Sequence, residues 1–264
     1  MRVPAPAPEH RILVRPTVRA AWALVREHPR ESVLPSLLIE VPVTLIIAVV
    51  TAVMFLTVFG DNQFKLATDL DGDDTQGVVF LLLLGAGVQA LFAQVAHGAT
   101  IAGVASVLRG KPGGATAALD AAFARMGALL LMAVILVIFG TLLLVSLVGI
   151  VLVPLLLIRL SMSYEALMVN NLRVTQAFAR SWRLTSGHVL RILGTLLFGG
   201  LTALPAFFFA FFLNAAVVGS RTQEIVLATV VAMAVALILA PVYAFFTALT
   251  TIIYFKLLLQ TPGE

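Results

Sequence analysis

The chain has 264 residues, of which 61% are hydrophobic and 11% are charged. A soluble domain is about half apolar and about a quarter charged, so this composition indicates a polytopic membrane protein. The chain contains no cysteine, which excludes disulfides, thiolate metal sites and cysteine nucleophiles.

The N-terminal region is basic and rich in proline, and we expect residues 1–15 to form a disordered tail. A short amphipathic helix is predicted to follow from Pro16, because proline suits the first turn of a helix. Trp22 would lie on the apolar face of this helix and Arg19 on its polar face. Pro29 is expected to end it, since the residue before a proline avoids helical geometry.

Long apolar runs predict an all-α bundle of six transmembrane helices in a single membrane domain at 16–260, with a short tail at 261–264. About 20 helical residues cross the hydrocarbon core. The uncharged run Gly127–Ile158 is too long for one span, so we expect it to turn back at Ser146–Gly149. The second span is also long, and we expect it to project from the bilayer or to break near His97–Gly98. The expected spans are residues 33–59, 77–108, the two halves of 127–170, 189–218 and 225–259.

Two further short helices are predicted, each directly before a pair of spans. Segments 18–23, 119–124 and 174–179 share the pattern apolar-x-x-Ala-aromatic-Ala. The last two extend identically by one residue, so that 122–125 and 177–180 both read Ala-Phe-Ala-Arg. We therefore expect a threefold repeat, in which each unit is an interfacial helix followed by a transmembrane hairpin. Chance similarity is the alternative, because alanine and phenylalanine are common in this chain.

The third of these short helices carries the strongest signal. Between Asn170 and Arg191 the chain holds four arginines and a histidine but no acid. Drawn as a helix, this segment places Phe178 and Trp182 on one face and most arginines on the other. Such a helix is expected to lie flat in the headgroup layer on the cytoplasmic side. The candidate lipid-contacting residues of the three helices are Arg19, Trp22, Phe123, Arg125, Arg173, Phe178, Arg180, Trp182 and Arg183.

Lysine and arginine are concentrated in alternate connections between the expected spans, while the loop at 61–76 is acidic. The positive-inside rule then predicts a multi-pass protein of the cytoplasmic (inner) membrane with both termini in the cytoplasm. Anionic lipid headgroups are the expected partners, and a partner membrane protein or a second copy of the chain remains open. Nucleic acid is not expected, because each basic helix is short and flanked by spans.

The segment Tyr164–His188, and above all its run Ala179–Thr185 (Ala-Arg-Ser-Trp-Arg-Leu-Thr), resembles the signature of a family of bacterial and archaeal six-span membrane proteins. The turn Arg109–Lys111 before a short helix is also similar to that family. One branch of the family is the membrane domain attached to some glycerophosphodiester phosphodiesterases. The resemblance implies a six-helix fold and a non-catalytic accessory role. The enzyme activity of that branch belongs to a separate soluble barrel, so it is not carried over to this chain.

No catalytic, cofactor or nucleotide motif occurs in the sequence, and the four histidines are too dispersed to predict a metal centre. The segment Asp69–Asp74 begins like a calcium loop, but Asp74 stands where glycine is required, so a solvated loop is favoured. The polar residues within expected spans are better candidates, namely Glu40, His97 and Arg159. A structural Glu40–Arg159 ion pair, or snorkelling of these side chains to the interface, is favoured over a transport site, because charges inside a bilayer are costly and usually paired.

Two functions from different classes remain open. The favoured one is a non-enzymatic integral membrane protein that interacts with lipid or serves as an accessory or scaffold subunit. The alternative is a small-molecule or ion transporter or a channel-like protein, which the repeated hairpins and the proline and glycine breaks would suit. That alternative needs a water-filled cavity lined by Glu40, His97 and Arg159. A membrane-embedded enzyme is least favoured, since no span carries a cluster of acids or histidines.

Overall fold

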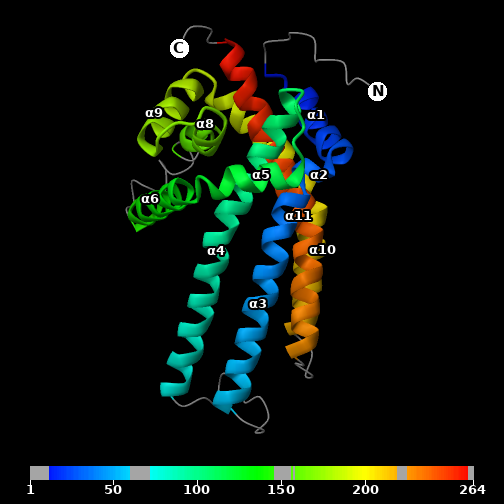
Figure 1. Ribbon diagram of the computed structural model, residues 1–264, viewed down its shortest axis with the longest axis vertical. Coiled ribbons are helices and arrows are strands. Elements are labelled where there is room, and N and C mark those ends of the chain that lie inside the picture. Colours follow the sequence, from blue (N-terminus) through cyan, green and yellow to red (C-terminus); the bar gives the residue numbers. More distant parts are fainter. Residues whose placement is uncertain (1–11, 60–71, 146–155, 157, 219–224, 261–264) are drawn as a thin grey trace.

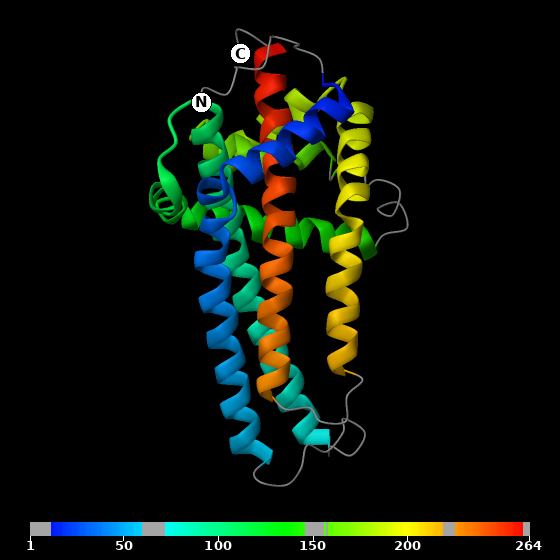
Figure 2. The ribbon, with the colours of Figure 1, turned by 90° about the vertical axis from the view of Figure 1, so that its right-hand side faces the viewer.

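The computed structural model describes residues 12–59, 72–145, 156, 158–218 and 225–260, and all regular structure in these residues is helical. The four longest helices of the bundle run side by side (Figures 1 and 2). They are α3 (Leu34–Phe59), α4 (Gly72–Leu108), α10 (Val189–Val218) and α11 (Ile225–Gln260). The predicted all-α fold is therefore confirmed.

Five shorter helices gather at one end of this bundle and form what we call the cap (Figure 1). They are α1 (Val14–Glu27), α2 (Pro29–Ser32), α5 (Gly114–Phe123), α8 (Ser163–Val169) and α9 (Val174–Thr185). The described chain begins in the cap, and α11 ends there. Every lysine and arginine of the described residues lies in the cap or at the cap end of a long helix, whereas Asp73 and Asp74 open α4 at the opposite end.

Three helical segments are long and apolar enough to cross a membrane, at Leu83–Leu108, Val189–Leu213 and Met233–Gln260. The apolar segment Leu34–Val50 of α3 is shorter. α5 and the following α6 (Met126–Val145) would make a further span only as a pair bent by 65°. Together with the composition, these helices indicate a membrane protein, while the six spans and the repeat remain predictions.

α4 continues through His97–Gly98 without a break, which favours the first of the two expected alternatives. Its 37 residues correspond to a helix of about 55 Å, compared with a hydrocarbon core of about 30 Å. The C-terminal end of α4 lies within the cap (Figure 1). There Gly103 lets α4 approach α2 very closely, because a Cβ atom at this position would lie 1.9 Å from the carbonyl oxygen of Glu31.

The segment predicted to form the third and fourth spans differs from expectation. α6 runs across the axis of the long helices rather than along it (Figure 2). The predicted turn at Ser146–Gly149 lies outside the described residues. The fourth span was predicted to continue to Asn170, and this is wrong: the chain turns at Ser161 and Met162, and α8 is a separate short helix.

α11 is the central helix of the packed core and contacts α1, α3, α4 and α10. Its side chains Phe245, Leu249 and Ile253 are fully buried. Trp22 of α1 stacks on Phe245 with ring centroids 4.2 Å apart. α1, whose predicted end before Pro29 is confirmed, is thereby fixed across the cap end of α10 and α11. It begins at Val14, so the last residues of the expected tail are helical; residues 1–11 and 261–264 lie outside the described part.

Candidate functional site

The three short helices that share the sequence pattern also share a pattern of burial. The central alanine is fully buried in each, at Ala21, Ala122 and Ala177. The next residue is aromatic and partly or largely exposed: Trp22 and Phe178 are partly buried, and Phe123 is 49% exposed. The common pattern therefore buries one small residue completely and places an aromatic ring at the boundary of the core, where Trp22 and Phe178 still pack against it.

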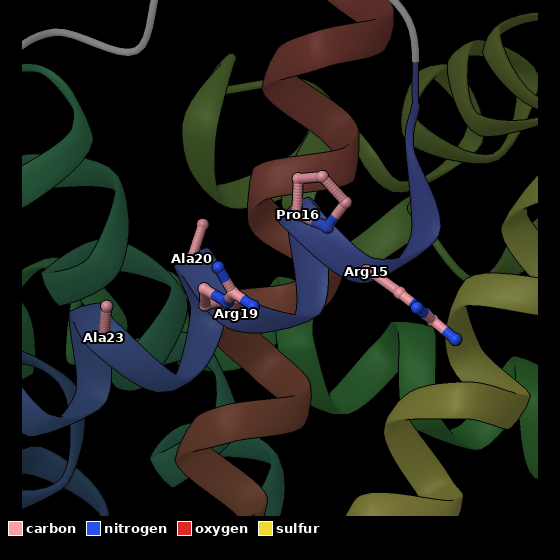
Figure 3. A pocket seen from close by; sticks show the side chains of 5 residues that line it. All are labelled: Arg15, Pro16, Arg19, Ala20 and Ala23. Carbon is pink, nitrogen blue, oxygen red and sulfur yellow. The ribbon is translucent and has the colours of Figure 1, made fainter.

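The outer face of α1 carries two guanidinium groups one helical turn apart. Arg15 and Arg19 line a shallow hollow of about 380 Å³ together with Pro16, Ala20 and Ala23 (Figure 3). Residues four apart lie on the same face of a helix, but the side chain of Arg15 extends away from that of Arg19 (Figure 3). The small side chains of the two alanines leave room beside them. The surface of the hollow itself is almost entirely apolar, so the two arginines supply charge beside the hollow rather than within it.

α9 presents a similar face to solvent. Arg173 and Arg183 are exposed, and the ring of Trp182 is 44% exposed. The guanidinium carbon of Arg159 lies 5.0 Å from the centre of that ring, which is the geometry of a cation–π contact. α9 thus combines exposed cations with a partly exposed aromatic ring, and the guanidinium of Arg159 packs against one face of that ring.

Two of the predicted lipid-contacting arginines are directed into the protein instead. The guanidinium of Arg125 donates to the carbonyl oxygens of Leu167 at 2.7 Å and Leu172 at 3.3 Å. Arg180 is partly buried and interacts electrostatically with the hydroxyl of Tyr254. These side chains are engaged in holding the cap together, which a pattern of faces along one helix does not reveal.

Arg109 acts in the same way as Arg125. Its guanidinium donates to the carbonyl oxygen of Val169 at 2.7 Å. The carbonyls of Leu167 and Val169 belong to the last turn of α8, where helix carbonyls lack partners within the helix and carry partial negative charge. Two arginines from other segments therefore satisfy the C-terminal end of this short helix and fix its position.

The run Ala179–Thr185, which carries the family resemblance, has a structural role at the turn between Arg159 and α8. The hydroxyl of Ser181 donates to the carbonyl oxygen of Arg159 at 2.7 Å and accepts the N–H of Met162 at 3.2 Å. Thr185 donates to the same carbonyl at 3.4 Å. These side chains replace the backbone bonds that a continuous helix would have made, which explains why the chain turns here.

The structure does not bring Glu40, His97 and Arg159 together as one site. The guanidinium of Arg159 donates to Ser186 Oγ at 2.7 Å, and the expected ion pair with Glu40 is not present among the described residues. Glu40 lies partly buried on α3. His97 Nδ1 is 3.2 Å from the hydroxyl of Thr247 on α11.

A polar cluster around α8 was missed by the sequence reasoning. The rings of Tyr164 and His97 are nearly perpendicular with their centroids 5.1 Å apart, and the hydroxyl of Tyr164 donates to Gln94 Oε1 at 2.7 Å. The next residue, Glu165, is 1% exposed. One feature of the sequence could have drawn attention to this cluster: Glu165 is the single acid between Asp120 and Glu224.

The environment of Glu165 disfavours a charge. Burial raises the pKa of its carboxyl to about 7, although a hydrogen bond from the side chain of Thr250 opposes this shift. Oε2 of the carboxyl has no hydrogen-bond partner among the described residues. A buried carboxyl with one unmatched oxygen is better accommodated as the neutral acid.

The described residues define an all-helical membrane protein, and three of the five cap helices, α1, α2 and α9, carry arginines. Within the part of the chain that the structure describes, no three His, Asp or Glu side chains are grouped so that they could hold a metal ion. Residues 69–71 of the acidic segment lie outside the described residues, and 72–74 form the first turn of α4. No family model, no curated protein and no solved structure matches this chain.

Proposed function

We propose that this chain is a non-enzymatic protein of the cytoplasmic membrane whose cap binds anionic lipid headgroups and serves as an accessory or scaffold surface. The observation that carries the proposal is the composition of the cap face. Exposed arginines on α1 and α9 lie at the same end of the molecule as partly exposed aromatic rings. Arginines near an anionic leaflet gain about 1 kcal/mol each, and tryptophan prefers the interface between lipid and water.

The charge distribution supports an orientation with the cap and both termini in the cytoplasm. The described cations lie at the cap end, and the first acids of α4 lie at the other end. Positive charge is retained on the cytoplasmic side of membrane proteins. In this orientation the hollow beside Arg15 and Arg19 lies on the cytoplasmic side.

The packing of the short helices supports six spans in a threefold repeat. α5 packs on α4, the helix that precedes it, and α9 packs on α8 and α6, which precede it in turn. α1 packs on α10 and α11, the last two helices of the chain. Each short helix thus contacts the unit before it in cyclic order. The six-span family resemblance agrees with this layout and with an accessory role.

Removing the exposed charges is expected to weaken lipid binding without unfolding the protein. We expect the variant with Arg15, Arg19, Arg173 and Arg183 all replaced by glutamine to bind phosphatidylglycerol at least about tenfold more weakly, since each charge contributes about 1 kcal/mol. Native mass spectrometry of the purified protein in mild detergent, titrated with phosphatidylglycerol or phosphatidylcholine, measures this difference directly.

The matched control carries lysine at the same four positions and keeps the charge. It should retain most of the phosphatidylglycerol binding, and all three proteins should bind phosphatidylcholine equally. Equal phosphatidylglycerol binding by the glutamine variant and the natural protein would rule out the cap as a lipid site.

The second candidate is a transporter, which the polar contacts between α4, α8 and α11 favour. Gln94, His97, Tyr164 and Thr247 form a connected set there. Against it, the neighbouring positions Phe245, Leu249 and Ile253 of α11 are fully buried in an apolar core. The lipid-binding role therefore fits the structure better.

A further inference from the structure

α8 is held on several sides within the cap when its side chains are buried. It packs against α4, α9 and α11, and the guanidinium groups of Arg109 and Arg125 hold the carbonyls of its last turn. Ser163, Glu165, Ala166 and Leu167 are all buried. A change at any of these side chains must therefore be transmitted to the neighbouring helices.

The carboxyl of Glu165 faces α11 from this position. One oxygen is hydrogen-bonded with the side chain of Thr250, whose hydroxyl also lies 3.1 Å from the carbonyl oxygen of Thr247, and Oε2 has no partner among the described residues. Tyr254, one turn further along α11, interacts electrostatically with both Glu165 and Arg180. The polar groups around Glu165 therefore interact with one another, and none of the described ones forms a hydrogen bond with Oε2.

The charged and titratable groups around Glu165 come from each element packed against α8. α9 contributes Arg180, which interacts electrostatically with Tyr254 on α11. α4 contributes Arg109, which binds the carbonyl oxygen of Val169, and His97, which meets the ring of Tyr164. Arg125 binds the carbonyl of Leu167.

We propose that the carboxyl of Glu165 is a buried proton-binding site that couples proton uptake to the packing of α8 against α11. With the proton on Oε2 the carboxyl is neutral, and its burial carries no charge penalty. When the proton leaves to water, a carboxylate remains inside the cap, and α8 opens toward solvent to hydrate it. The cap is therefore tighter at low pH and looser at high pH.

The direction follows from linkage between protonation and folding. Burial raises the pKa of Glu165 from 4.5 in the open state to about 7 in the closed state. The stabilisation of the closed state by the protonated carboxyl is complete below pH 4.5 and is lost as the pH rises through about 7. Between about pH 6 and about pH 8, the local opening constant of α8 should rise about tenfold.

Hydrogen exchange measured by mass spectrometry, corrected for the intrinsic pH dependence of exchange, tests this at the backbone amides of α8. Those of Ala166 and Asn170 donate to Met162 and Ala166 when α8 is closed. The natural protein should lose about tenfold protection over this range, and Glu165→Gln should show no such loss. Glu27→Gln, which removes an exposed carboxylate from α1, is the matched control and should behave as the natural protein does.

A second measurement does not depend on the folding of a variant. Infrared difference spectra of the natural protein should show one protonated-carboxyl band that disappears with a midpoint near pH 7. Such a band supports the proposal. The proposal is overturned if no carboxyl titrates in this range, or if Glu165→Gln keeps the pH dependence of protection.

Discussion

Replacing Gly103 by alanine is expected to lower the melting temperature of the detergent-solubilised protein by several degrees. The new Cβ atom would lie 1.9 Å from the carbonyl oxygen and 2.9 Å from the carbonyl carbon of Glu31. Both atoms belong to the backbone, so no side chain can turn aside, and α2 must move away from α4. Overpacking of this kind typically costs roughly 1–3 kcal/mol. Fluorescence-detected size-exclusion chromatography after heating measures the loss.

Gly87→Ala is the matched control, because Gly87 lies on the same helix and a Cβ atom there meets nothing within 4 Å. Alanine favours the helical state over glycine by roughly 0.5–1 kcal/mol, so this variant should be as stable as the natural protein or slightly more so. Equal melting temperatures for Gly103→Ala and Gly87→Ala would show that α2 does not pack on α4 as described.

Ser181→Ala is expected to be similarly damaging, although it removes only one oxygen atom. Ser181 is fully buried, and its hydroxyl bonds both the carbonyl of Arg159 and the N–H of Met162. Without it, the N–H of Met162 loses this partner inside the protein, and leaving a buried polar group unmatched costs about 1–3 kcal/mol. We expect a lower melting temperature and faster hydrogen exchange throughout α8.

Thr175→Ala provides the comparison on the same helix. Thr175 is exposed on α9, and exposed substitutions away from special contacts usually change stability by less than about 0.5 kcal/mol. If Ser181→Ala is as stable as Thr175→Ala, then the turn before α8 is held by other contacts and the role assigned to Ala179–Thr185 is incorrect.

The sequence predicted the helices well where the signal is local. The apolar run predicted for residues 189–218 coincides with α10, and the run at 225–259 ends one residue before α11 does. Helix ends marked by proline, such as the end of α1 before Pro29, were also predictable. Composition and periodicity determine these features, because they depend on residues close together in the chain.

The contacts of the cap could not be predicted in the same way. Arg125 and Leu167 are 42 positions apart, so nothing near Arg125 shows that its guanidinium binds a carbonyl. The orientation of α6 was missed for another reason: the helix is apolar on all sides, so no face indicates which way it lies. Glu165 stood out only as an isolated acid, and its burial depends on three other helices.

Labelling of single cysteines tests most directly whether the three short helices share the cytoplasmic side of the membrane. The chain has no cysteine, so a thiol placed at Ala23, Ala124 or Ala179, which are exposed at the equivalent position of each copy, is unique. We predict that a membrane-impermeant maleimide labels all three variants in inverted membrane vesicles and none of them in intact cells. Labelling of any one of the three in intact cells would contradict the proposed cap.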